Sequence, residues 1–335
     1  TRGCRRVSPG CEHCFAEQIA YRFSGPGLPY EGLIQLSKQG PRWNGEGRFI
    51  PDALDAPLHW RDPSYIFVNS MSDLFFERFT NEEIAAVFGV MAACPWHAFQ
   101  ILTKRPGRAL EWFAWLRREA REVNAGRGMS EAAYCLEMAQ KQCSDVKLAR
   151  DVDRTCSQPS PLPNVWMGVS VEDQQRANER MPLLVKIPAA TRFVSYEPAL
   201  EKVDFDPPTC PSCGQHDLLN HGDDGNGTPF CAECGDEMEF NVWLDSVDLV
   251  IVGGESGGGA RPFDLAWARS VVAQCDEVGT KVFVKQFGKN RTDSEAEPGS
   301  PVLSQITCSK GDDPAQWPPM LRRQELPALP TFPAV

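Results

Sequence analysis

The sequence predicts an α/β fold in the form of a partial (β/α) barrel, and three observations lead to this prediction. Six short apolar runs recur along the 335 residues, segments with helical spacing separate them, and polar residues follow each run at its C-terminal end. Strands that alternate with helices are typical of a (β/α) barrel or of a doubly wound sheet. Because a barrel builds its active site from the C-terminal ends of its strands, the polar strand ends favour the barrel. A Rossmann-like sheet is the alternative.

The predicted strands are rich in β-branched and aromatic residues. Near-continuous apolar runs are typical of parallel strands covered on both faces, whereas half-exposed antiparallel strands alternate polar and apolar residues. The runs are 65–70 (YIFVNS), 99–104 (FQILTK), 165–170 (VWMGVS), 192–197 (RFVSYE), 249–255 (LVIVGGE) and 281–287 (KVFVKQF).

Helices are predicted at residues 81–93, 108–123, 177–184 and 264–278. In the first of them Asn81 is the expected N-cap, because an apolar face with helical spacing follows it.

Polar side chains at the strand ends form the predicted active-site set. We expect them to converge on one cavity, as strand ends do at the mouth of a barrel. A structural hydrogen bond in the barrel rim is the alternative for each of them. The set comprises Asn69, Ser70, Asp73, Thr103, Lys104, Ser170, Glu172, Ser195, Glu197, Glu255, Lys285 and Gln286.

Two insertions and a tail accompany the predicted barrel of residues 1–288. The first insertion, 122–163, contains a helical piece at 130–154 and a Pro/Ser loop at 157–163. The second, 207–241, carries its own cysteines. Residues 289–335 are rich in Pro, Ser and acidic residues, which predicts an irregular or partly disordered tail.

The formal net charge of −11 argues against a general nucleic-acid-binding protein. Non-specific affinity for phosphates needs clustered Lys and Arg. Local recognition stays open, since basic stretches occur at 103–108 and 117–121. No apolar run approaches the roughly 18 residues of a membrane span, and no signal peptide is recognisable. We therefore expect a soluble, cytoplasmic protein.

The cysteines carry most of the chemical information. Thirteen is an odd number, and without a secretion signal it indicates metal ligation and reduced thiols instead of a disulfide framework. Cys4, Cys11 and Cys14 lie in one loop, which the Ser8-Pro9-Gly10 turn can fold back on itself.

Three thiolates would leave one iron of a cubane cluster without a protein ligand. The helical spacing after Cys14 also predicts that the loop runs into a helix, whose positive end favours thiolates. The alternative is a structural zinc site with His13 or a remote residue as the fourth ligand.

The second cysteine cluster has the spacing of a zinc ribbon. Cys210 and Cys213 form one pair, and Cys231 and Cys234 follow as the second pair, so four thiolates can close a tetrahedral site. Metal binding would fold this short segment, and a surface that grips a substrate or partner is its further possible role. The other six cysteines are expected to be mostly buried thiols; an auxiliary cluster on Cys135, Cys143 and Cys156 is the alternative.

Several stretches resemble one known family. Over residues 3–288 they are similar to a phage-associated, radical S-adenosylmethionine (SAM) type family of three-cysteine phage and prophage proteins. The stretches are GCRRVSPGCEHCFAE, FVNSMSDLF, FQILTKRP, NVWMGVSVEDQ, RFVSYEPAL, LVIVGGESGGGARPFD and VFVKQFG.

The resemblance implies a partial TIM barrel of the radical SAM kind, a [4Fe–4S] cluster on Cys4, Cys11 and Cys14, and SAM bound at the open iron. In such enzymes the reduced cluster cleaves SAM to a 5′-deoxyadenosyl radical, which abstracts hydrogen from the substrate. This chain departs from the usual motif in two places. Six residues instead of three separate Cys4 from Cys11, and His13 replaces the aromatic residue before Cys14.

Site roles also follow from the resemblance. The methionine amino group would be held by Asn69, Ser70, Ser72 and Asp73, and the ribose or carboxylate by Ser170 and Glu172. Contacts to the substrate or the SAM carboxylate are expected from Lys104, Glu255, Arg261 and Lys285. Close backbone approach is expected at Gly253 and Gly254.

Phage association implies nucleic-acid modification. We expect a radical rearrangement (an isomerase or mutase reaction) or other C–H chemistry on a modified base, such as a hypermodified thymine, in a nucleoside or in DNA of a phage-infected host. An electron donor would be a partner. One alternative is a zinc-dependent barrel hydrolase or deaminase, disfavoured because the five histidines do not form ligand pairs at strand ends. The other is a non-catalytic metalloprotein that binds nucleic acid through the ribbon.

Overall fold

The computed structural model describes residues 1–122, 129–143, 160–210, 212–213, 218–219, 230–297 and 300–328. The chain divides into two compact units. The first comprises Thr1–Ser170, Lys186–Ser195 and Pro327–Val335, and the second comprises Val171–Val185 and Tyr196–Leu326. The predicted boundaries of the two insertions stay predictions.

A six-stranded sheet is the framework of the fold. Its strands are β3 (Tyr65–Val68), β4 (Ala98–Thr103), β5 (Val165–Ser170), β6 (Thr191–Tyr196), β11 (Leu249–Gly253) and β13 (Lys281–Gln286), in the order β13-β11-β6-β5-β4-β3. The order follows the chain without reversal, whereas a doubly wound sheet changes direction at a switch point. The topology is therefore compatible with a partial (β/α) barrel, and all six predicted strands are confirmed.

Strands β3, β4, β5 and β6 pair in parallel, and so do β11 and β13. Val68 lies opposite Ile101, Phe99 opposite Val165, and Ser170 opposite Ser195. All six residues of β5 are buried, as expected for an inner parallel strand. The edge strand β3 differs from the expectation of two covered faces, because Tyr65 and Phe67 are exposed there.

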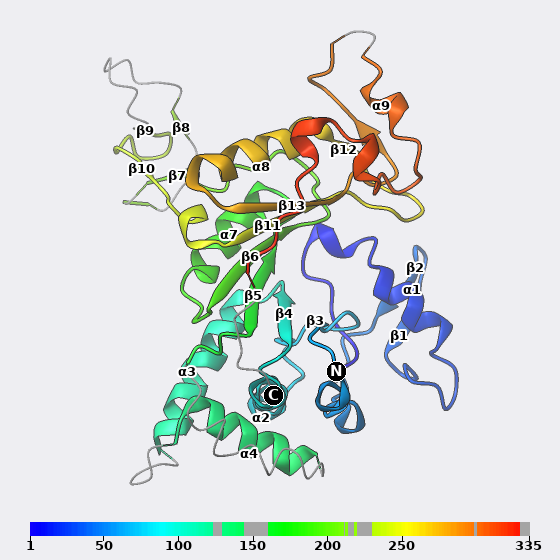
Figure 1. The fold of residues 1–335 in the computed structure, drawn as a ribbon, viewed down its shortest axis with the longest axis vertical. Helices are drawn as coiled ribbons and strands as arrows, with labels where there is room; N and C mark the ends of the chain where they lie inside the picture. The colour runs from blue at the N-terminus through cyan, green and yellow to red at the C-terminus, as the bar shows by residue number, and fades with distance from the viewer. Residues whose placement is uncertain are drawn as a thin grey trace. The chain divides into compact units, whose positions relative to one another are not determined.

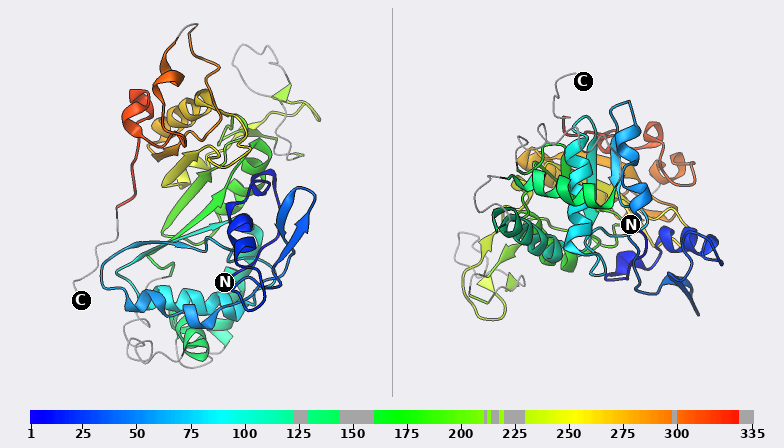
Figure 2. Two further views of the ribbon diagram at one scale, coloured as in Figure 1. Left: turned by 90° about the vertical axis from the view of Figure 1, so that its right-hand side faces the viewer. Right: turned by 90° about the horizontal axis from the view of Figure 1, so that it is seen from below.

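Helices α2 (Asn81–Ala93), α3 (Pro106–Glu122) and α4 (Glu131–Gln142) pack together beside β3, β4 and β5 (Figures 1 and 2). Trp112 is fully buried in their core, with its ring 4.4 Å from that of Phe88. The prediction of Asn81 as the N-cap is wrong by one residue. Thr80 is the cap, since it forms a reciprocal capping box with Glu83. Helix α4 covers the first part of the helix predicted at 130–154, and most of the remainder lies outside the described residues.

A small module precedes the sheet. Helix α1 (Phe15–Arg22) begins directly after Cys14, as predicted, and lies beside the hairpin of β1 (Ile34–Ser37) and β2 (Gly40–Trp43) (Figure 1). Its core contains Ala16, Ala20, Leu33 and Trp43, and the side chains of Cys4 and Cys14 pack against this core.

The second unit contains α7 (Gln174–Leu184) and α8 (Leu265–Val278), both predicted from their spacing. The described part of the tail has little regular structure and is packed. Its β14 (Arg291–Thr292) pairs with β12 (Phe263–Asp264), α9 (Val302–Gln305) is a single turn, and Trp317 is buried against Phe287. In the described parts of the chain, no helix has both the length and the apolar character needed to cross a membrane.

Candidate metal centres and strand-end residues

The four ribbon cysteines form a compact ligand group. Cys210 Sγ lies 3.4 Å from Cys234 Sγ, Cys213 Sγ lies 3.5 Å from Cys231 Sγ, and Cys213 and Cys234 are 3.7 Å apart. Tetrahedral zinc with Zn–S bonds of about 2.3 Å places its sulfurs about 3.8 Å apart. The group can therefore hold a metal ion such as zinc, and an iron–sulfur centre uses the same four ligands.

Short strands bring the ribbon cysteines together. Cys210 follows β7 (Pro208–Thr209), which pairs with β10 (Glu239–Phe240), while Cys231 ends β9 (Phe230–Cys231), which pairs with β8 (Leu218–Leu219). The nearby backbone N–H of Cys234 lowers the pKa of the Cys231 thiol. His216 and His221 lie outside the described residues.

The segment that contains the ribbon is strongly acidic. Residues 203–260 hold twelve Asp and Glu and no Lys or Arg, which leaves 33 acidic against 34 basic residues in the rest of the chain. The net charge of −11 is thus located in this segment. A phosphate backbone is repelled by negative charge, so the composition of this segment argues against nucleic-acid binding through the ribbon.

The N-terminal cysteine loop has a different geometry. The turn Pro9–Cys11 closes as predicted, with the Cys11 N–H donating to the Ser8 carbonyl at 2.9 Å. Cys4, Cys11 and Cys14 are free thiols of intermediate exposure. Among the described residues, the four ribbon cysteines have ligand atoms that all lie within 4.8 Å of one another. The sulfurs of Cys4, Cys11 and Cys14 do not form such a group. The largest distance among their sulfurs is therefore greater than in the ribbon group.

Local structure favours thiolate ligation at Cys14. The residue caps α1, and the nearby backbone N–H groups of Glu17 and Ala16 act to lower the pKa of its thiol. Burial nevertheless raises the pKa of Cys14, and it raises the pKa of Cys4 to about 11. Both sulfurs are therefore protonated at neutral pH unless a metal displaces the protons.

A buried carboxylate fastens the loop to α1. Glu17 is 1% exposed, and its carboxylate accepts hydrogen bonds from the Nε and Nη2 groups of Arg6, a residue of the loop. It also accepts the backbone N–H of Trp43 at 3.0 Å. The ion pair thus joins the cysteine loop, the helix and the hairpin.

Asp73 and Arg105 connect the loop to the ends of β3 and β4. Asp73 accepts the Thr103 hydroxyl at 2.8 Å, the Lys104 N–H at 3.0 Å and Arg105 Nη1 at 3.0 Å. Its Oδ1 also takes the Phe75 N–H, so each carboxylate oxygen has two donors. Four donors of the protein thus hold Asp73 in place, and its predicted contact with the methionine amino group stays a prediction.

The other predicted residues near the end of β3 are more accessible. Asn69 donates to the Thr1 hydroxyl at 2.8 Å, and Ser72 shares a hydrogen bond with the same hydroxyl. Ser70 is exposed. These side chains remain candidates for ligand contact in the first unit.

Two of the predicted residues of the second unit form a cluster with Glu197. Lys285 Nζ lies 3.0 Å from Glu197 Oε2, and Gln286 Nε2 donates to Glu197 Oε1 at 3.2 Å. A Cβ at Gly253 would lie 3.1 Å from this carboxylate, and one at Gly254 would lie 2.6 Å from the Phe287 carbonyl. Both glycines are thus closely packed against the chain itself, and the approach to a cofactor expected there stays a prediction.

The remaining strand-end residues are held in ion pairs or buried. Arg261 donates its backbone N–H and its Nε to Glu255 at 2.8 and 3.1 Å. Glu172 is fully buried and paired with Arg180 at 2.8 Å. Ser170 and Ser195 are buried partners in the sheet.

A family model matches most of the chain. The family described as "Protein of unknown function (DUF5131)" matches residues 1–319. The chain belongs to the DUF5131 family. No curated protein and no solved structure matches it.

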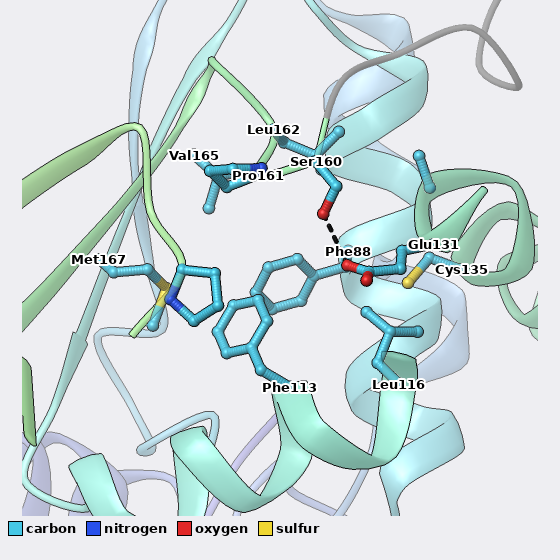
Figure 3. Close-up of a pocket in the computed structure, with 12 residues that line it drawn as sticks. Phe88, Phe113, Leu116, Glu131, Cys135, Ser160, Pro161, Leu162, Val165 and Met167 are labelled. Atoms are coloured by element: carbon cyan, nitrogen blue, oxygen red, sulfur yellow. Dashed lines mark hydrogen bonds between the residues drawn. The ribbon is translucent and has the colours of Figure 1, made fainter. Parts of the chain in front are cut away.

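In this DUF5131 chain, a separate apolar pocket lies between α2, α3, α4 and β5 of the first unit. Figure 3 shows that the Ser160 hydroxyl, which bonds Glu131 at 2.6 Å, is at its edge. Its lining is mostly apolar and includes Phe88, Phe113, Leu116, Cys135, Leu162, Val165, Met167 and Pro188. None of the predicted cofactor residues lines this pocket.

The remaining cysteines and histidines give no second metal group among the described residues. Burial strongly raises the pKa of Cys135, Cys143 ends α4, and Cys156 lies outside the described residues. His97 is buried beside the Ser64 N–H and the Pro57 carbonyl. His59 pairs with Asp55.

Sequence reasoning missed Arg6, Glu17 and Arg105 as site residues of this DUF5131 chain. Their signals were present: Arg105 directly follows the predicted strand 99–104, and Glu17 lies in the first turn after Cys14. A local pattern does not reveal which distant groups such charges contact.

Proposed function

We propose that the chain is a radical SAM enzyme, with a [4Fe–4S] cluster held by Cys4, Cys11 and Cys14 and SAM bound at the open iron. One observation carries the proposal. Three free, partly exposed thiols lie on a loop that Glu17 and Arg105 fasten to α1 and to the end of β4, and these thiols do not form the compact group that the ribbon cysteines form.

The donor set fits this cofactor. Three thiolates and an open position are what a site-differentiated cluster needs, and the N–H groups at the start of α1 stabilise sulfur with negative charge. In the first unit, the residues proposed to contact SAM lie at the end of β3 and are Asn69, Ser70 and Ser72. In the second unit, Lys285 and Arg261 supply positive charge for a carboxylate, each beside an acidic partner.

When bound, the cluster and SAM would supply a 5′-deoxyadenosyl radical for hydrogen abstraction from the substrate. The protein's own contribution is to bind and orient. The Arg6–Glu17 pair keeps the loop closed, and Asp73 fixes the turn at Thr103–Arg105. The four ribbon cysteines are proposed to bind structural zinc.

The proposed substrate is a modified nucleic-acid base, as a free nucleoside or in phage DNA, and the proposed reaction is a rearrangement. The family resemblance at the sequence level supports this part. Outside residues 203–260 the chain is close to neutral, so local basic stretches can meet a nucleic acid there. A base within a duplex would have to be flipped out of the stack to react.

Anoxic reconstitution with iron and sulfide tests the proposal. The wild type is expected to take up about four iron atoms per chain, to absorb in the blue region of the visible spectrum, and to release 5′-deoxyadenosine from SAM under reducing conditions. The Cys11→Ala/Cys14→Ala variant should lose all three properties and keep its zinc. The matched control, Cys213→Ala, should lose zinc and keep the N-terminal cluster.

The rival functions give different results. A colourless wild type with two zinc ions per chain would refute the radical enzyme and favour a zinc hydrolase or a metal-stabilised binding protein. Formation of 5′-deoxyadenosine that increases with a modified nucleoside, but not with oligonucleotides, would place the reaction before incorporation of the base into DNA.

A further inference from the structure

Arg105 is a buried cation in direct reach of the cysteine loop. Arg105 is 7% exposed, and its guanidinium contacts three separate segments of the first unit. Nε donates to Glu77 at 3.1 Å, Nη2 donates to the Arg5 carbonyl at 3.0 Å, and Nη1 donates to Asp73 at 3.0 Å. The ring of Phe76 lies against it, 5.0 Å from the guanidinium carbon. These contacts leave the guanidinium little freedom to move.

The same Nη1 group also faces a predicted cluster ligand. Cys4 Sγ lies 3.9 Å from Arg105 Nη1, which is a long hydrogen bond to sulfur. Arg105 adjoins Cys4 in space although it is 101 residues away in sequence. Because a guanidinium does not lose its proton in proteins, this positive charge is permanent.

Asp73 supplies the opposing charge. Its Oδ2 shares Arg105 Nη1 with Cys4, and its other bonds to Thr103, Lys104 and Phe75 hold it in place. The cation and the carboxylate therefore act on Cys4 from fixed positions and with opposite sign. Side-chain exposures of 6% and 9% mean that solvent screens the pair only weakly.

We infer that Arg105 and Asp73 are a positioning pair that sets the reduction potential of the cluster through Cys4. The inference rests on the proposed function. In the step concerned, the cluster gains one electron from an external reductant, no bond to the protein forms or breaks, and the cluster becomes more negative by one charge. Arg105 stabilises this added charge and raises the potential, as hydrogen bonds to ligating sulfur do, whereas Asp73 lowers it.

Potentiometric titration of the reconstituted protein with dithionite, followed by electron paramagnetic resonance, measures the effect. Arg105→Gln should shift the midpoint to more negative values, so that the ratio of reduced to oxidised cluster at a fixed potential falls at least tenfold; tenfold corresponds to about 59 mV for one electron. Arg105→Lys, which keeps the charge, should recover most of the shift. Asp73→Asn should move the midpoint in the opposite direction.

Arg78→Gln is the matched control. It removes the same charge from the same unit, but Arg78 is exposed and pairs with Glu46. Its midpoint should equal that of the wild type, because an exposed charge is screened by solvent and salt. Iron and sulfide contents of all variants are compared first, so that a shift is read only from proteins with a full cluster.

Each result decides between specific conclusions. A full cluster in Arg105→Gln with the midpoint of Arg78→Gln would overturn the inference and leave the proposed function intact. A wild type without any cluster would overturn the proposed function itself. If Arg105→Gln binds no iron, Asp73→Asn decides: a positive shift supports the pair, and an unchanged midpoint refutes it.

Discussion

Replacing Glu17 with Ala is expected to open the N-terminal cysteine loop without unfolding the rest of the first unit. The change removes the acceptor of the Arg6 guanidinium and of the Trp43 N–H, and the Glu17 side chain is only 2% exposed. Breaking a buried ion pair costs about 3–5 kcal/mol. Because the Arg6 side chain is 25% exposed and can regain water, the expected cost here is about 2–4 kcal/mol.

Hydrogen exchange of the backbone amides measures this cost. If closing is fast, the exchange rate follows the population of the open loop, so about 2–4 kcal/mol corresponds to a roughly 30-fold to several-hundredfold increase over residues 8–17. Glu17→Gln keeps an acceptor for Trp43 and loses only the charge. It should cost less, about 1–2 kcal/mol.

Glu46→Gln serves as the control. Glu46 also pairs with an arginine, at 3.3 Å, but both side chains are more than half exposed, so about 0–1 kcal/mol is expected. Exchange in Glu17→Ala that is no faster than in Glu46→Gln would refute the claim that this ion pair closes the loop. Iron uptake gives a second readout: the Ala variant should bind the cluster less completely than the control.

Three further predictions concern stability and metal content. Gly168→Ala should destabilise the protein by about 1–3 kcal/mol, because the new Cβ would lie 2.5 Å from the Phe193 ring. Gly107→Ala in α3 adds a Cβ that meets nothing within 4 Å, and it should stabilise the protein by about 0.5–1 kcal/mol. Equal melting temperatures of the two variants would contradict both predictions. Burial lowers the pKa of His97 from 6.5, so the unfolded chain binds the proton more tightly than the folded chain does. The contribution of neutral His97 to stability is therefore full above pH 6.5 and is lost as the pH falls. A His97→Gln variant whose melting temperature falls in acid as that of the wild type does would exclude this contribution. Cys213→Ser should lower the zinc content, measured by elemental analysis, from one ion per chain to well below one, and an unchanged value would show that the ribbon does not bind the ion.

The elements of the fold could be predicted because their signals are local. Each buried strand is a near-continuous apolar run, and the helix after Cys14 shows its spacing within eight residues. The position of β3 at the edge of the sheet could not be predicted, since Tyr65 and Phe67 are as apolar as residues of an inner strand. Edge or centre depends on which strands pair, and this is a property of the whole chain.

The candidate site could be predicted only as a set of ligands. The spacing of Cys210, Cys213, Cys231 and Cys234 identified the ribbon group, because each pair is held by its own short turn. By contrast, the contact between Arg105 and Cys4 depends on the packing of a loop against a strand end far along the chain. Asp73 was recognised by its position, but its saturation by four donors depends on the turn after β4.

The concentration of negative charge in residues 203–260 also affects how the protein behaves in solution. Proteins with a net charge far from zero repel one another and stay dispersed, and near neutrality they associate more readily. Deleting only the predicted ribbon insertion, residues 207–241, would remove seven of these acidic residues and no basic ones, and would leave 38 acidic against 34 basic residues. The shortened protein should therefore associate near neutral pH at lower concentrations than the full chain, whether or not the ribbon takes part in the reaction.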